Sequence, residues 1–121
     1  MTLVVIKTNF ALKVSFRSRK LQRSLEDLKI SARTYGALAR RVDQRFQELL
    51  ASQNMETFSA IPGVRCHLLT GDRKGIWSVD LSGNMRLLFI PDHKTLPVLP
   101  DGSLNRREVT AIKILSIEDT H

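Results

Sequence analysis

Apolar and polar residues follow two different periodicities along this chain, and the change falls near Pro62. Before that proline, leucines at 21, 25 and 28 share one face of a helix expected over 18–28, with Ser18 placed to cap it. A longer helix is expected over 31–52, capped by Ser31. Its apolar positions recur at helical spacing: Tyr35, Leu38, Val42, Phe46 and Leu49.

After Pro62 the pattern alternates, which indicates strands with one buried face. Four strands are expected after Pro62, near 64–69, 76–81, 85–90 and 109–117. A further strand is expected near 13–16, before the helices. The turns Gly71–Gly75 and Ser82–Asn84 join the central ones as hairpins. Two helices followed by a mostly antiparallel sheet predict an α+β fold, with the helices on one sheet face and the other face open and basic.

Three further segments complete the expected organisation. A short β-like run covers 3–7, and 54–58 is typical of one short helical turn. The stretch 91–108 carries Pro97, Pro100 and Gly102, so it is expected to be an exposed, mobile loop. No repeat or linker divides the chain, and we expect one domain over 1–121.

Composition narrows the class of protein. The 121 residues carry a net charge of +7, which suits RNA, DNA or an acidic protein, although a basic surface without a ligand fits too. The single cysteine, Cys66, is expected to be a packed strand residue in a reducing, cytoplasmic setting. The sequence shows neither an apolar run of membrane-spanning length nor the spacing of metal or cofactor ligands, so we expect no membrane association and no cofactor.

The arginines raise two questions. Arg86 stands in an otherwise apolar strand, where a cation needs an acidic partner, such as Asp80 or Asp119, or an anionic ligand. The longer predicted helix carries Arg33, Arg40, Arg41 and Arg45 between its apolar positions. They are expected to form a solvated face, or else to receive an acidic partner or an RNA backbone.

If the anionic partner is RNA, its cleavage without a metal would require a base, an acid and cations for the phosphate. His67 and His121 are the acid/base candidates, because an ordinary histidine pKa of about 6.5 suits proton exchange near neutrality. Arg73, Lys74 and Arg86 are the cation candidates, and Asp119 would orient an imidazole or hold the tail. The alternatives stay open: a solvated turn for Arg73 and Lys74, a satisfied strand histidine for His67, and a frayed terminus for His121. His93 is expected to be inert.

From Leu12 to His121 the chain resembles the HigB-like "proteic killer" branch of the RelE/ParE toxin superfamily. The matching segments, in order, are Val14–Phe16 with Arg19–Gln22, Ile61–Leu68, Gly71–Gly75, Ser78–Leu81, Arg86–Phe89, Val109–Leu115 and Glu118–His121. The resemblance implies a RelE-like fold and a ribosome-dependent, metal-independent mRNA endoribonuclease. Its partners would be a helix-turn-helix antitoxin, mRNA on the ribosome, and operator DNA only through the antitoxin. The implied RNA contacts are Arg65, Lys74, Trp77 and Lys113, beside catalytic His67, Arg73, Arg86, Asp119 and His121.

The chain departs from that family in two places. Residues 1–11 form an extension before the usual start, and Thr120 stands where the family ends Asp-Tyr-His. Two further functions therefore stay in view: a catalytically weakened homologue that binds its antitoxin, and a ParE-like inhibitor of a topoisomerase that cleaves nothing. The pair of histidines favours the nuclease, whereas Thr120 favours the weakened homologue.

Overall fold

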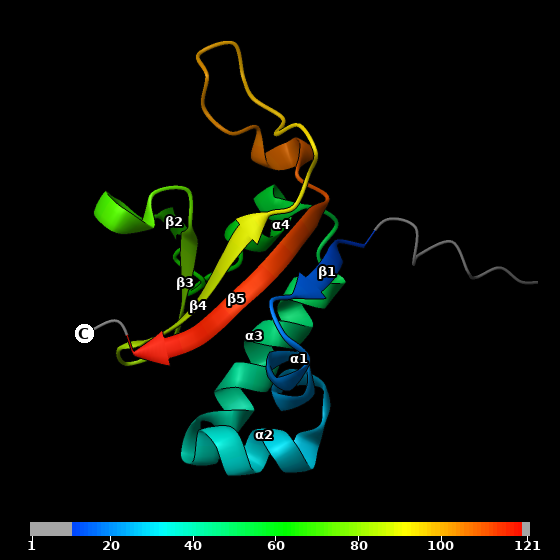
Figure 1. Ribbon diagram of the computed structural model, residues 1–121, viewed down its shortest axis with the longest axis vertical. Coiled ribbons are helices and arrows are strands. Elements are labelled where there is room, and N and C mark those ends of the chain that lie inside the picture. Colours follow the sequence, from blue (N-terminus) through cyan, green and yellow to red (C-terminus); the bar gives the residue numbers. More distant parts are fainter. Residues whose placement is uncertain (1–10, 120–121) are drawn as a thin grey trace, which may run out of the picture.

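The computed structural model describes residues 11–119 of the chain, so the expectation for 3–7 falls outside the described residues. The helices are α1 (Arg19–Glu26), α2 (Leu28–Tyr35), α3 (Ala39–Ala51) and α4 (Met55–Ser59), with the 3-10 turn η2 (Gly36–Leu38) between α2 and α3. The strands are β1 (Lys13–Phe16), β2 (His67–Leu68), β3 (Trp77–Ser82), β4 (Met85–Pro91) and β5 (Ala111–Asp119). The α+β prediction is confirmed, with the helices packed on one mixed sheet (Figure 1).

Both stretches predicted as helix are helical, but they form three helices instead of two, and Asp27 rather than the predicted Ser31 caps the second of them. Ser18 caps α1 as expected, with its hydroxyl accepting from the amide of Leu21 at 3.1 Å. The carboxylate of Asp27 then caps a new helix, accepting from the amides of Lys29 and Ile30. The predicted long helix is therefore wrong as one piece. It is interrupted at Gly36, whose φ of +55° lies outside the helical range.

The sheet has the strand order β1-β5-β4-β3-β2. β1 pairs in parallel with β5, while the other neighbours are antiparallel. The turn at Gly83 joins β3 to β4 as a hairpin, as the sequence predicts. In the pairing of β4 with β5, Asp119 lies opposite Met85. β5 lies two residues later than predicted and the 64–69 strand shortens to β2.

The alternation along the strands separates two sheet faces. Val79, Leu87, Phe89 and Ile114 are fully buried and pack with Phe46 of α3 and Phe58 of α4. Their neighbours in sequence, Ser78, Asp80, Arg86 and Leu88, point to the opposite face, which we call the open face; Asp80 and Arg86 are half-buried there, whereas Ser78 and Leu88 are buried. No helix among residues 11–119 is long and apolar enough to cross a membrane.

The loop after β4 projects from the body of the molecule (Figure 1). We call residues 92–105 the arm. The arm has backbone pairing of its own. Val98 and Leu104 form an antiparallel β-bridge, and the amide of Leu99 donates to the carbonyl of Ser103 at 2.8 Å. The expected mobility of this segment stays a prediction, but the segment is a small hairpin rather than an irregular loop.

Candidate functional site

The register of the sheet places polar side chains in rows on the open face. Asp80 of β3 lies opposite Arg86 of β4, and Arg86 lies opposite Glu118 of β5. Ser78, two residues before Asp80 on β3, lies opposite His67 of β2. Directly opposed residues in an antiparallel pair share a face, and diagonal neighbours lie roughly 7–8 Å apart. His67 therefore lies within reach of a ligand that also contacts the Asp80–Arg86 pair.

A bulge carries the chain into β2. The amide of Asp80 donates to the carbonyl of Val64, whereas His67 pairs with Ser78, so the 64–67 segment holds one residue more than its partner. Arg65 has φ +49° there, a conformation that long side chains rarely adopt. The bulge shortens the predicted strand and turns Arg65 toward Asp80. The backbone carbonyl oxygen of Arg65 lies 3.1 Å from Nδ1 of His67.

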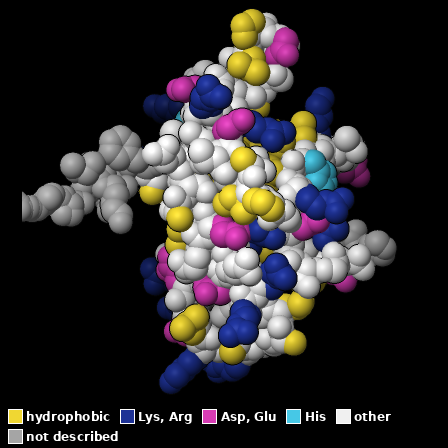
Figure 2. Space-filling view, turned by 180° about the vertical axis from the view of Figure 1, so that it is seen from behind, with side chains coloured by type: hydrophobic (Ala, Val, Ile, Leu, Met, Phe, Trp, Pro, Cys, Tyr) yellow, Lys and Arg dark blue, Asp and Glu magenta, His cyan; other side chains and the backbone are white. Residues whose placement is uncertain are grey.

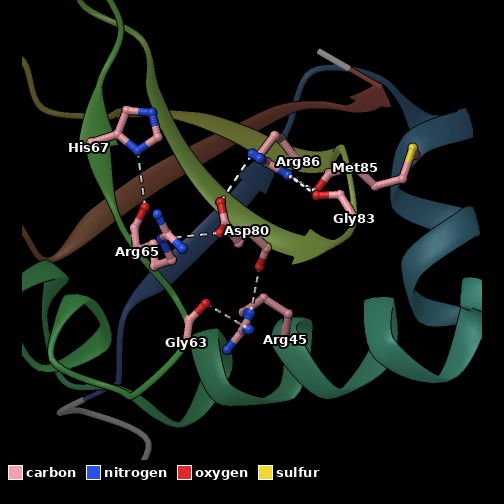
Figure 3. Close-up of polar contacts among 8 residues, drawn as sticks. All are labelled: Arg45, Gly63, Arg65, His67, Asp80, Gly83, Met85 and Arg86. Atoms are coloured by element: carbon pink, nitrogen blue, oxygen red, sulfur yellow. Dashed lines mark hydrogen bonds and ion pairs between the residues drawn. The ribbon is translucent and has the colours of Figure 1, made fainter. Parts of the chain in front are cut away.

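Two arginines flank the carboxylate of Asp80 (Figure 3). Nε of Arg86 lies 3.0 Å from one oxygen, and Nη1 of Arg86 donates to the carbonyls of Gly83 and Met85. Nε of Arg65 lies 3.5 Å from the other oxygen, and 79% of the Arg65 side chain is exposed. Arg86 is thus a fixed cation at 22% exposure, while Arg65 is a loosely held one. Of the alternatives considered for Arg86, namely Asp80, Asp119 or an anionic ligand, the structure has the ion pair with Asp80.

Arg45 supports this cluster from α3 on the helix side of the sheet (Figure 3). Its Nε donates to the carbonyl of Asp80 at 2.9 Å and its Nη2 to the carbonyl of Gly63 at 3.3 Å. Its Nη1 pairs with Glu48 at 2.6 Å. The prediction that Arg45 is solvated is wrong, because its side chain is only 4% exposed. Arg45 follows Val42 by three residues and precedes Leu49 by four, so it lies on the apolar stripe of the helix, and this spacing is the signal in the sequence for its burial.

The basic turn after β2 lies over the open face. Nη1 of Arg73, in the 3-10 turn η3 (Gly71–Arg73), lies 2.8 Å from Glu118 on β5. β3 and β4 separate β2 from β5, and neighbouring strands lie about 4.8 Å apart, so this pair spans the sheet. A hydrogen bond from Ser116, together with Arg73, lowers the pKa of Glu118 below its ordinary value. Arg73 and Arg86 are thereby brought to the same row.

The remaining predicted residues are distributed unevenly. Lys113 lies opposite Ile90, four residues along β4 from Arg86 and hence roughly 13 Å away. Trp77 is only 7% exposed, and the Arg106 guanidinium lies 4.6 Å from its ring centroid, so an RNA base would have to displace Arg106 to stack there. Lys74 follows η3. Asp119 ends the described chain opposite Met85, and the predictions for Thr120 and His121 fall outside the described residues.

We call the following polar side chains together the open-face row: His67, Arg65, Asp80, Arg86, Glu118 and Arg73. Two other reactive side chains, Cys66 and His93, are set apart from it. Burial raises the pKa of the Cys66 thiol despite a hydrogen bond from Ser59, which fits a packed residue rather than a nucleophile. Nε2 of His93 accepts the amide proton of Thr110 at 3.1 Å, so His93 fastens the base of the arm to the chain entering β5. No group of three or more potential metal ligands occurs within residues 11–119.

Comparison with known proteins supports the fold. The chain is similar to a solved structure described as a YoeB/ParE toxin from Agrobacterium tumefaciens, with a TM-score of 0.52 and 10% sequence identity over 91% of this chain and 100% of that one. The fold is therefore consistent with that of RelE/ParE-type toxins. No model of a known protein family matches the sequence. No curated protein matches it either.

Proposed function

We propose that this protein is the toxin of a type II toxin–antitoxin system and a HigB-like, metal-independent endoribonuclease that cleaves mRNA on the ribosome. The observation that carries the proposal is the row on the open face. Arg65 just before β2, His67 of β2, Arg73 of η3 and Arg86 of β4 lie on one side of a sheet whose fold is consistent with that of RelE/ParE-type toxins.

In the proposed reaction, the ribose 2′-oxygen attacks the adjacent phosphorus and its proton passes to a base. The bond from phosphorus to the 5′-oxygen breaks, and that oxygen takes a proton from an acid. His67 serves as one proton carrier, with its Nδ1 side against the carbonyl of Arg65 and its imidazole exposed to solvent. His121 is the other carrier. Asp80 orients Arg86 for the crowded phosphate, whose charge the arginines stabilise.

The proposed partner is a helix-turn-helix antitoxin, through which the complex would reach operator DNA. An acidic antitoxin segment would neutralise the toxin by competing for the arginines of the open-face row. The net charge of +7 favours such a partner, because opposite charge speeds association at low salt. Figure 2 shows Lys and Arg side chains interspersed with Asp and Glu on the face it displays, so recognition there would depend on local clusters rather than on a uniform field.

A second function has specific support. Arg65, Arg73 and Arg86 each already face a carboxylate, and Thr120 stands where an aromatic ring is usual. Both features fit a homologue whose arginines serve the structure and whose remaining role is antitoxin binding. A ParE-like topoisomerase inhibitor would also need no proton carriers.

The test is induction of this chain alone in a bacterium, followed by mapping of mRNA 5′ ends. His67→Ala, His121→Ala and Arg86→Ala should each lower cleavage by on the order of 10²- to 10⁴-fold. His93→Ala is the matched control, because that histidine lies away from the row, and it should cleave at the parent rate. Chelators should have no effect. Thermal melting of Arg86→Ala separates lost chemistry from lost folding.

Each outcome selects one function. Unchanged cleavage by both histidine variants removes the two-histidine mechanism. Absence of cleavage by the parent with ribosomes present replaces the nuclease by the binding-only homologue. Inhibited DNA supercoiling in the same cells would select the topoisomerase inhibitor.

A further inference from the structure

The exposed large apolar side chains gather in one part of the molecule. The described residues hold five of them, and four are on the arm or the adjacent β2: Leu68 at 46%, Leu96 at 48%, Val98 at 57% and Leu99 at 42% exposure. Figure 2 shows hydrophobic side chains at the tip where the arm projects. Scattered single apolar residues are normal on a surface, but a concentration of this kind marks an interaction site.

A groove lies beneath this apolar concentration. It has a volume of about 560 Å³, within the range of roughly 300–1,000 Å³ for ligand sites. Trp77, Leu68 and Pro91 line it on the sheet side, and Leu96, Ser103 and Leu104 line it on the arm side. Leu68 follows His67 on β2, so their side chains point to opposite faces. This groove is therefore distinct from the open-face row.

The charged side chains that line the groove between β2 and the arm are both basic. Lys74 and Arg106 line it, and no acidic residue occurs among its described lining residues. Arg106 lies against the ring of Trp77, which fixes one cation at the groove wall. An occupant should therefore combine apolar side chains with carboxylates.

The apolar surface continues beyond the groove. Leu99 lines a second hollow, of about 420 Å³, together with Arg106, Arg107 and one acidic residue, Glu56. Leu104 and Arg106 line both hollows, so the two adjoin at the base of the arm. A small ligand held in one hollow would leave the other apolar side chains in water. A protein segment lying along the arm would cover both.

We propose that the groove between β2 and the arm is a docking surface for an acidic amphipathic segment of a partner protein. The apolar side chains of that segment bury Leu68 and Leu96, and its carboxylates face Lys74 and Arg106. The inference does not depend on RNA cleavage, because none of the groove residues belongs to the His67–Asp80–Arg86 cluster. Lys74 and Trp77, which the family resemblance implies as RNA contacts, serve here only as a cation and as a wall of the groove.

The protein carries its own reporter for this test, since Trp77 is its only tryptophan. The probe is a short amphipathic peptide of leucine and glutamate, titrated while Trp77 fluorescence is recorded. Two comparison peptides replace its glutamates by lysine or its leucines by serine. We expect a saturable fluorescence change with the leucine–glutamate peptide, weaker binding for the serine version and none for the lysine version.

Substitutions inside and outside the groove test whether the peptide binds there. Leu96→Ser and Lys74→Gln should each weaken the peptide by about tenfold, since each removes one buried apolar or charged contact. Leu28→Ser is the control, because Leu28 is the fifth exposed apolar residue, at 71% exposure on α2, and it should bind as the parent does. Circular dichroism of each variant confirms folding.

Three results would overturn the proposal. The first is equal binding of the lysine peptide, or equal weakening by Leu28→Ser. The second is a saturable response to decanoate without one to the peptide, which would make the groove a site for a small amphipathic carboxylate. The third is dimerisation of the protein alone, seen by sedimentation and abolished by Leu96→Ser, which would make the occupant a second copy of this chain.

Discussion

Replacing Arg45 by leucine should destabilise the protein by about 3–5 kcal/mol, the usual cost of removing one partner of a buried ion pair. The substitution keeps most of the apolar volume and removes the guanidinium. The carbonyls of Asp80 and Gly63 then lose their donor, which costs about 1–3 kcal/mol for a buried acceptor; the cost falls mainly on the half-buried Asp80, because Gly63 is exposed and its carbonyl can bind water. Glu48 is 25% exposed and can turn toward water, so the low end of the range is expected.

Urea unfolding followed by Trp77 fluorescence would measure this change. A loss of about 3 kcal/mol is a large share of the roughly 5–15 kcal/mol that holds a domain together. It should lower the Tm by roughly 12 °C in a chain of this length. Arg41→Leu is the matched control, because Arg41 is exposed on the same helix and should change stability by less than about 0.5 kcal/mol.

A double substitution separates two contributions to the loss of stability: the hydrogen bonds that Arg45 donated, and the carboxylate of Glu48 left without its ion-pair partner. If Glu48 without its partner carries part of the cost, Arg45→Leu with Glu48→Leu should recover some of the lost stability. If Arg45→Leu costs no more than Arg41→Leu, the three bonds of Arg45 do not hold the site, and the reasoning fails.

Two further predictions concern titrating groups. Carboxyl NMR shifts should show Glu118 titrating below its ordinary pKa, and Ser116→Ala should raise that pKa more than Arg73→Ala does. Because the folded pKa is depressed, the stabilisation from Glu118 is present above the unfolded pKa and lost as pH falls through the folded value; an undisplaced midpoint would contradict this. The Cys66 thiol should react with iodoacetamide more slowly than free cysteine at mildly alkaline pH, since burial raises its pKa; an equal rate would contradict this.

Local patterns were sufficient to predict most of the elements. The Ser18 cap and the hairpin at Gly83 depend on neighbouring residues, and the structure has both. Along β3 the apolar residues Trp77, Val79 and Leu81 are buried as the alternation predicts, but Ser78 between them is buried too. The break at Gly36 also has a local cause. It was missed because the apolar spacing from Tyr35 to Leu49 continues across that glycine.

The candidate site depends on contacts that no local pattern specifies. The bulge at Arg65 becomes visible only when Val64 and His67 are matched against β3. Glu118 was not singled out, because its pairing with Arg73 requires the basic turn to cross the sheet. The Asp80–Arg86 pair could be offered from the sequence only as one alternative, since the register of the β3–β4 hairpin decides it.

The carboxylates on the open face have two opposite effects on the proposed binding of RNA: they hold the arginines in position, and they compete with the phosphate for them. Asp80 and Glu118 orient the arginines, but they also occupy the donors that a phosphate would use. Arg86 has carbonyl bonds besides its ion pair, so it should stay in place when a phosphate arrives. Arg65 is exposed and lies at a longer distance from Asp80, so it should exchange its carboxylate for a phosphate first. In the proposed nuclease, Arg86 would therefore fix the position of the phosphate, and Arg65, held beside His67 by the bulge, would close on it.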